Sequence, residues 1–92
     1  MNRNQLIDHV ARTTGLEVTS ATEAVVAVLD GIAGAVAAGE QVTLAGFGTF
    51  EARGRAARTG RNPQTGEPIE IAATTAPAFR AASAFRARVA SR

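Results

Sequence analysis

Residues 52–73 decide the fold of this chain, and they read ARGRAARTGRNPQTGEPIEIAA. A turn-forming centre, NPQTG at residues 62–66, separates two runs that are compatible with β-strands. The first run has no large apolar side chain, and the second has only Ile69 and Ile71. A stretch with so little apolar surface cannot bury itself in a core. We therefore predict a two-stranded β-arm, at about residues 53–73, that projects from a folded body.

Residues 1–40 carry the pattern of two helices. Asn2 and Gln5 have the spacing of a capping box, in which each side chain satisfies a backbone N–H of the other residue. Apolar residues then recur at helical spacing until Gly15. We therefore expect a first helix over Asn2–Thr13.

The second helix is expected to begin between Glu17 and Ser20 and to end near Gly39, a residue type suited to a helix C-terminus. Ser20 and Glu23 form a second capping-box pattern. An apolar stripe follows the helical period through Val18, Ala21, Val25, Leu29, Ile32 and Val36. Further valines widen this stripe, so we expect a partner helix or a second subunit to cover the helix on more than one side.

Residues 41–80 predict a three-stranded antiparallel sheet. The first strand is expected over Gln41–Ala45, where apolar and polar residues alternate. The second begins at Thr49, after a glycine-rich connection, and runs into the arm. The third returns from Glu67 to about Arg80. With two helices before the sheet and a short one after it, the fold class is α+β.

The alternation of side chains along a strand assigns these residues to two faces of the sheet. Phe50 and Phe79 are expected on the core face. Arg53, Arg55 and Arg80 then lie together on the opposite, uncovered face, continuous with the arm.

The end of the third strand and the last helix carry further signals. Pro77 has no backbone N–H to donate, which indicates a sheet edge or a bulge. The last helix is expected over Ala81–Val89, with Phe85 and Val89 facing the body and Arg86 facing solvent.

Composition limits what can stabilise so small a chain. A 92-residue chain that also carries an arm has a marginal core, and without cysteine it forms no disulfide, so oligomerisation is the expected source of further stability. The lack of cysteine suits a reducing compartment. We expect no leader peptide, because residues 1–8 are polar, and we expect the apolar stretch Ala24–Ala38 to be too short for a membrane span.

Charge is distributed unevenly. Residues 1–52 carry two basic and six acidic side chains, whereas residues 53–92 carry eight basic and two acidic ones. A basic half joined to an acidic half suggests a face that binds a polyanion. All ten basic residues are arginine, whose planar fork fits phosphate, although a genome rich in G and C would favour arginine over lysine as well.

Nothing in the sequence points to an enzyme, a cofactor or a metal. His9 is the only histidine, and the carboxylates are scattered over separate elements. Gly46-Phe47-Gly48 lacks the third glycine of a dinucleotide-binding loop and is expected to be a structural corner. The phenylalanines around it could stack bases, but their strand phase favours the core.

Four arginines lie at the base and tip of the predicted arm: Arg53, Arg55, Arg58 and Arg61. Charged side chains on a protein surface usually contact only water. The density of arginines on an unburied hairpin nevertheless favours polyanion binding. Pro63 at the tip either stiffens the turn or acts as a wedge between base steps, as in some minor-groove binders.

Several segments resemble the bacterial histone-like HU family. They are GFGTF at residues 46–50, RAARTGRNPQTGE at residues 55–67, PAF at residues 77–79, and the opening MNR and QLI within residues 1–7. The resemblance covers nearly the whole chain without gaps. Integration host factor, a relative of HU, shares the GRNP pattern at the tip.

The resemblance implies an intertwined homodimer and no small-molecule substrate or membrane partner. Residues 1–92 would form one domain, with a helical dimerisation part at 1–40, the sheet and arm at 41–80, and the last helix at 81–92. It also implies a non-enzymatic, nucleoid-associated protein of the bacterial cytoplasm. Such a protein binds, bends and compacts duplex DNA through the minor groove with little sequence specificity.

The site residues follow from the same resemblance. The expected DNA contacts are Arg3, Arg53, Arg55, Arg58, Arg61, Asn62, Pro63, Gln64, Arg80 and Arg86, with Pro63 intercalating. Ala82 and Ser83 depart from the family pattern, where a glycine and a basic residue are usual, and this puts contacts at that edge in doubt. Glu17 replaces a usual Ser or Thr cap.

Three alternatives stay open. One is a sequence-specific DNA-bending protein like integration host factor. Another is a structural or RNA-binding protein. The last is a heterodimer with a related chain.

Overall fold

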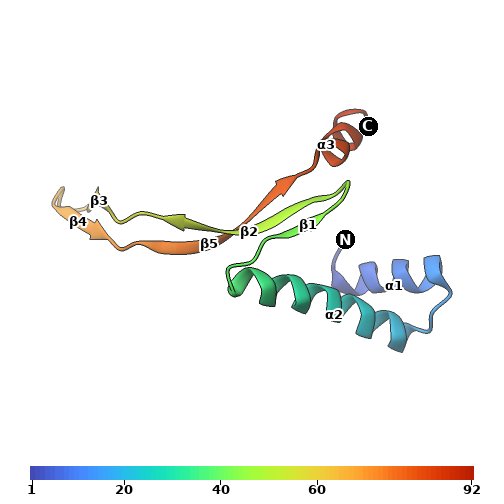
Figure 1. Ribbon diagram of the computed structural model, residues 1–92. Helices are drawn as coiled ribbons and strands as arrows, with labels where there is room; N and C mark the ends of the chain where they lie inside the picture. Colours follow the sequence, from blue (N-terminus) through green and yellow to red (C-terminus); the bar gives the residue numbers. More distant parts are fainter. The chain divides into compact units, whose positions relative to one another are not determined.

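The computed structural model describes all residues from Met1 to Arg92 (Figure 1). Its elements follow in the order α1 (Arg3–Thr14), α2 (Val18–Ala37), β1 (Val42–Leu44), β2 (Gly48–Arg55), β3 (Arg58–Arg61), β4 (Pro68–Ile71), β5 (Thr74–Ala81) and α3 (Ser83–Ala90). The α+β class predicted from the sequence is confirmed. The chain divides into two units, Met1–Gly34 and Ala35–Arg92. The finer division at residues 40 and 80 stays a prediction.

The first helix lies one residue further along the chain than the predicted range Asn2–Thr13, and the predicted Asn2 and Gly15 stand at its two ends. The Asn2 side chain accepts a hydrogen bond from the Gln5 backbone N–H at 2.9 Å, and the Gln5 side chain accepts one from the Asn2 N–H at 2.8 Å. This reciprocal pair is the expected capping box. At the other end the Gly15 N–H donates to the Ala11 carbonyl at 2.9 Å and closes the helix.

The second helix begins at Val18, so the capping box predicted at Ser20 is wrong. The Ala21 N–H donates to the Glu17 carbonyl at 2.9 Å, which makes Glu17 the residue that accepts the first helical bond. Ser20 is therefore already inside the helix, and its pattern with Glu23 has no capping role. The helix ends before Gly39 as expected, since the Gly39 N–H donates to the Val36 carbonyl at 3.0 Å.

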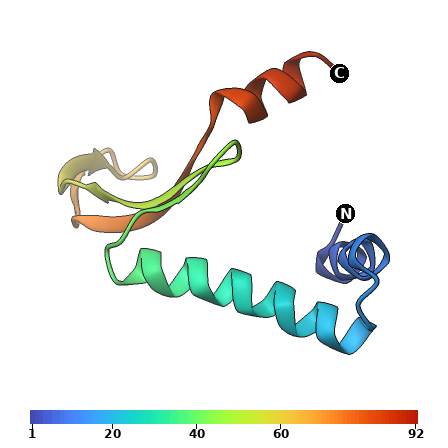
Figure 2. The ribbon, with the colours of Figure 1, turned by 45° about the vertical axis from the view of Figure 1, so that its right-hand side comes forward.

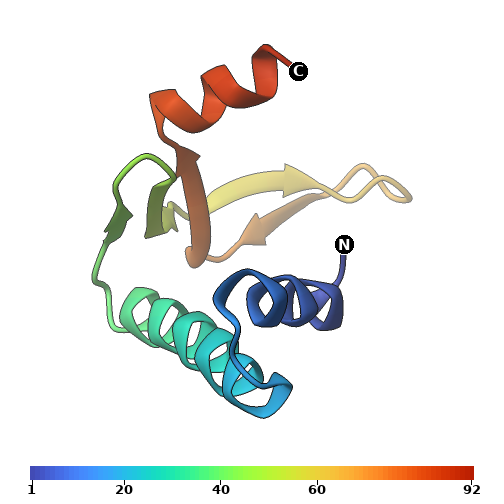
Figure 3. The same ribbon diagram turned by 90° about the vertical axis from the view of Figure 1, so that its right-hand side faces the viewer.

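The core of the first unit is small. Ile7 from α1 and Ala21 and Val25 from α2 are buried against one another, and α1 lies beside α2 (Figure 3). Further along α2, Val28 is 59% exposed and Leu29 is 43% exposed. The predicted apolar stripe is thus buried at Ala21, Val25 and Val36, whereas Val18 and Leu29 remain open within a single chain.

The second helix is longer than the apolar stretch from which a membrane span was excluded. It is 20 residues long and is apolar enough, by length and composition alone, to cross a membrane. The prediction that this stretch is too short is wrong, because the helix starts well before Ala24. A core helix of a soluble protein passes the same test, so the finding is weak evidence for a membrane span.

Three strands form the main sheet, in the order β1-β2-β5, all antiparallel. The ladder between β2 and β5 runs without a bulge from Gly48 opposite Ala81 to Arg55 opposite Thr74. Pro77 lies in β5, an edge strand of this sheet, so the edge alternative predicted for it is confirmed. The strands differ by a residue or so from the predicted bounds, since β1 is shorter and β2 starts one residue earlier.

The arm consists of two ladders in series, and this corrects the prediction of continuous strands. Beyond the main sheet, β3 and β4 pair as a separate two-stranded sheet (Figure 2). Both strands of the arm are interrupted at the same distance along it, one at residues 56–57 and the other at residues 72–73. All four residues are alanine. Alanine has low strand propensity and too small a side chain for cross-strand packing, so nothing there favours pairing.

The four phenylalanines of the chain gather on the core face of the sheet and hold α3 there. Phe85 of α3 stacks on Phe47 with ring centroids 5.0 Å apart, and Phe50 lies 4.7 Å from Phe79. The Ala82 N–H also donates to the Phe47 carbonyl at 2.9 Å, directly before α3 begins. The rings thus pack on one another on the predicted face. Phe47 and Phe79 are still 44% and 42% exposed in this chain, so the core role predicted for them over base stacking stays a prediction.

The last helix differs from its prediction in two respects. It begins at Ser83 rather than Ala81, because β5 continues to Ala81. Val89, which was expected to face the body, is 51% exposed in this chain, whereas Phe85 stacks on Phe47.

Gly48 allows β2 and β5 to approach under the Phe79 ring. A Cβ placed at Gly48 would lie 2.6 Å from the Arg80 carbonyl oxygen and 2.6 Å from the Phe79 ring. We expect Gly48→Ala to lower the free energy of unfolding by about 1–3 kcal/mol, because the backbone oxygen cannot move aside without breaking the ladder. Urea unfolding of both proteins measures the difference.

Gly54→Ala is the matched control. Gly54 lies in the same strand, and a Cβ there meets nothing within 4 Å. Equal losses of stability in the two variants would show that the close approach at Gly48 is unimportant.

Candidate nucleic-acid interface

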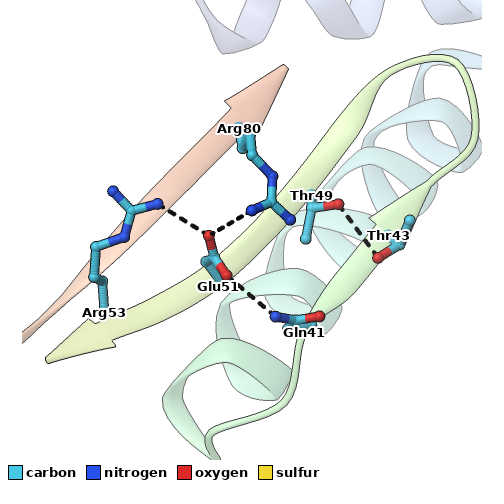
Figure 4. Close-up of polar contacts among 6 residues, drawn as sticks. All are labelled: Gln41, Thr43, Thr49, Glu51, Arg53 and Arg80. Carbon is cyan, nitrogen blue, oxygen red and sulfur yellow. Dashed lines mark hydrogen bonds and ion pairs between the residues drawn. The ribbon is translucent and has the colours of Figure 1, made fainter. Parts of the chain in front are cut away.

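The face of the sheet opposite the phenylalanines carries an arginine pair around one carboxylate. Directly paired residues share a face, and the register places Thr49 opposite Arg80 and Glu51 opposite Ala78. The Glu51 Oε1 atom lies 3.0 Å from Arg53 Nη2 and 3.8 Å from Arg80 Nη1 (Figure 4). The prediction that Arg53 and Arg80 share the outer face is therefore confirmed.

Glu51 is held from a third side as well. Gln41, just before β1, donates from its side-chain nitrogen to Glu51 Oε2 at 3.1 Å. Nearby, the Thr43 and Thr49 hydroxyls lie 3.3 Å apart across β1 and β2 (Figure 4). The pairing of Glu51 with two arginines was not predicted, because one of them, Arg80, is distant in the chain.

The two arginines remain open to an incoming anion. Their side chains are 61% exposed for Arg53 and 64% for Arg80, whereas the Glu51 side chain is 14% exposed. An exposed ion pair of this kind contributes about 0–1 kcal/mol, so it holds the guanidinium groups only weakly. Each guanidinium also has donors left over, and a phosphate could take two of them at once.

Along the arm, the arginines divide between two faces. Arg58 shares a face with Gly60, because alternate residues of β3 point the same way, and Arg61 lies on the other face. Ile71 packs over Gly60 so closely that a Cβ there would lie 2.9 Å from its Cδ1 atom. One face of the arm is thus partly apolar, with Ile69 and Ile71 on it, and both faces carry an exposed arginine.

The tip is a turn closed by several hydrogen bonds. The Gly66 N–H donates to the Asn62 carbonyl at 2.7 Å, and the Asn62 N–H donates to the Glu67 carbonyl at 2.8 Å. The Asn62 side chain accepts from the Gln64 N–H at 2.9 Å, and Arg61 Nη1 donates to the Gly66 carbonyl at 3.2 Å. Gly66 has a φ of 73°, a left-handed conformation that glycine adopts without strain. Within this turn Pro63 is exposed.

The predicted contact residues thus fall into four places. Arg53 and Arg80 are joined through Glu51, and Arg55 lies exposed at the end of the same ladder. The tip and outer ribbon carry Arg58, Arg61, Asn62, Pro63 and Gln64. Arg86 is exposed on α3, and Arg3 is exposed at the start of α1 in the other unit. No group of three or more histidine, cysteine or acidic side chains gathers as a metal site would require.

Comparison with known proteins decides the family. A family model described as "Bacterial DNA-binding protein" matches residues 1–90. The chain belongs to this family. Its match spans both units, so the helices as well as the sheet and arm belong to the family pattern.

Curated members of the family include close relatives of this chain. The DNA-binding protein HU of Geobacillus stearothermophilus is 54% identical over 86 residues, which are 94% of this chain and 96% of that protein. The DNA-binding protein HU-beta of Pseudomonas aeruginosa is 49% identical over the same shares. The resemblance to HU found in the sequence is therefore confirmed.

Solved structures of HU proteins also resemble this chain. A cocrystal structure of Anabaena HU with DNA superposes with a TM-score of 0.91 at 47% identity and covers 100% of both chains. HU from Thermotoga maritima superposes with a TM-score of 0.68 at 27% identity, over 97% of this chain and 98% of that one. The family consists of architectural DNA-binding proteins, so this chain is not an enzyme and acts in the cytoplasm, where bacterial DNA lies.

Proposed function

We propose that this protein binds duplex DNA with little sequence preference, enters the minor groove with its arms and bends the duplex at the nucleoid. One observation carries the proposal. Exposed arginines follow one face of the sheet and continue along the arm, and the tip of the arm carries an exposed proline. The likeness to the Anabaena HU–DNA complex, over the full length of both chains, supports it.

Phosphate contacts supply the affinity in this mechanism. Arg53, Arg55 and Arg80 line the sheet face, and Arg58 and Arg61 extend the positive charge to the tip. A guanidinium that donates two parallel hydrogen bonds to one phosphate binds it without reading the base. The chain offers few side chains suited to base edges in the major groove, so the binding is expected to be tolerant of sequence.

Pro63 supplies the bend. It is the apolar residue at the outermost turn and is exposed between Asn62 and Gln64. An apolar wedge that enters between base pairs unstacks them at a cost of a few kcal/mol, which wider contact between the bent duplex and the protein offsets.

Two copies of the chain are expected to act together. Large apolar side chains stay open on both units, among them Leu29 of α2, which is 43% exposed, and Phe79 of the sheet, which is 42% exposed. A second copy, or a closely related chain, would cover these surfaces and bring a second arm. The homodimer thereby explains how so small a core becomes stable.

The alternative of a sequence-specific relative, like integration host factor, is not favoured. The relatives that match nearly the full chain are named HU. Footprinting on random and on selected DNA separates the two functions, because a sequence-specific protein protects one site and a nonspecific one protects all sequences about equally.

Phosphate binding predicts a steep dependence on salt. We expect the logarithm of the binding constant to fall linearly with the logarithm of the salt concentration, by about 0.9 for each phosphate neutralised. Arg55→Ala should make the slope shallower by about 0.9 for each contact it removes. Mobility shifts on linear duplex at a series of salt concentrations measure both slopes, and a flat response would contradict the proposal.

The wedge predicts that binding and bending can be separated. We expect Pro63→Ala to keep most of the affinity, since the arginines remain, but to lose most of the bending. Ligation of short DNA into circles at saturating protein measures the bend. Unchanged circle formation in the variant would rule out Pro63 as the wedge.

Glu51 is expected to oppose DNA binding, because its carboxylate lies among the arginines that would meet phosphate. Glu51→Gln keeps the shape of the side chain and removes its charge, so we expect affinity to rise about two- to fivefold. Glu23→Gln on α2 is the control, with the same change in net charge. Equal gains in the two variants would mean that net charge, rather than the arginine pair, is responsible.

A further inference from the structure

Two arginines from different strands reach toward one point on the outer face of the sheet. The cross-strand pairs along this face are Thr49 with Arg80, Glu51 with Ala78, and Arg53 with Ala76. Arg80 and Arg53 therefore lie on opposite sides of the middle pair, about 13 Å apart along the strands. Both guanidinium groups nevertheless approach the same atom, Glu51 Oε1, at 3.0 Å from Arg53 and 3.8 Å from Arg80 (Figure 4).

The carboxylate at the meeting point is fixed from another side. Gln41 donates a hydrogen bond to its second oxygen, Oε2, at 3.1 Å. The Glu51 side chain is largely covered, whereas both arginines that approach it are open to solvent. The residue opposite Glu51 is Ala78, whose methyl group is too small to keep the two guanidinium groups apart.

The contacts with Glu51 use only part of what the arginines can donate. Arg53 donates one hydrogen bond to Oε1, whereas the 3.8 Å from Arg80 is too long for a hydrogen bond. A guanidinium group has five N–H donors, so most of them remain free on both side chains. Neither arginine forms an ion pair with any other acidic residue. An anion that arrives from solvent therefore meets donors of both arginines close together.

We propose that Arg53 and Arg80 bind one and the same DNA phosphate, and that Glu51 is the positioning residue that holds their guanidinium groups together. This inference rests on the proposed binding of duplex DNA and specifies how many phosphates this part of the face contacts. Arg55 does not share the site, because it lies opposite Thr74 at the far end of the ladder, about 20 Å along the strands from Arg80.

The number of phosphates contacted is measured by the salt dependence of binding to a linear duplex. If the pair shares a phosphate, Arg53→Ala and Arg80→Ala each leave one guanidinium on it and hardly change the slope. The double variant loses the contact, so its slope becomes shallower by about 0.9 for each chain. Two separate phosphates would give about 0.9 for each single variant and about 1.8 for the double variant, which would overturn the proposal.

Arg55→Ala is the matched control, because it removes the same charge from the same strand. We expect this single substitution to make the slope shallower by about 0.9 for each chain, since Arg55 has no second arginine on its phosphate. An unfolding midpoint for each variant confirms that the fold is intact. If every arginine variant left the slope unchanged, the proposed function would be contradicted, and phosphate binding without DNA would still decide whether the pair shares an anion.

Inorganic phosphate tests the pair in the absence of DNA. The side-chain N–H signals of Arg53 and Arg80 are followed by NMR while phosphate is added to the full chain. A shared site predicts that both signals shift along one binding curve with one dissociation constant, and that Arg53→Ala weakens the response of Arg80. Separate curves, or an Arg80 response that Arg53→Ala does not change, would overturn the proposal.

Glu51→Ala tests the positioning role of the carboxylate. Without it, the two positively charged groups repel each other and are no longer held together, so their signals are expected to follow different phosphate curves. Glu51→Gln is the control, because it retains an oxygen that accepts from both arginines, and it should keep the common curve. A common curve that survives in Glu51→Ala would show that Glu51 does not position the pair.

Discussion

The antiparallel ladder between β2 and β5 is the constraint on which the rest of the second unit depends. It starts at Gly48, where the Phe79 ring and the Arg80 carbonyl occupy the space that any side chain would need. A slip of one residue would move every side chain of a strand to the other face. The close fit at Gly48 therefore keeps the phenylalanines on one face and Arg53 with Arg80 on the other.

The sequence predicted the features that depend on local spacing. The capping box of Asn2 and Gln5 and the strand phase around Arg53 are such features. α2 begins at Val18, inside the predicted range, but the predicted capping box is wrong, because Ser20 and Glu23 have cap spacing by chance while the backbone of Glu17 accepts the first helical bond. The pairing of Glu51 with Arg80 could not be foreseen, since it depends on which strands become neighbours and on the register between them.

The open apolar surfaces indicate that the folding unit is larger than a single chain. The buried core of the first unit is formed mainly by Ile7, Ala21 and Val25, and much of α2 stays uncovered. The sheet likewise leaves Phe47 and Phe79 partly open, at 44% and 42% exposure. In the proposed homodimer these surfaces become shared interior, so that folding and association are one process and stability rises with protein concentration.

The paired interruption of the arm has a mechanical consequence. At residues 56–57 and 72–73 the ladder stops on both strands at one level, so the twist of the main sheet does not dictate the twist of the outer hairpin. The interruption is therefore expected to transmit little twisting force between the two ladders. In the proposed complex, strain from a curved or straight duplex would then be taken up at these alanines before it reached the phenylalanine cluster. In the proposed complex, the stiffness of the DNA would therefore help to set the bend angle, and one protein could hold duplexes of differing curvature.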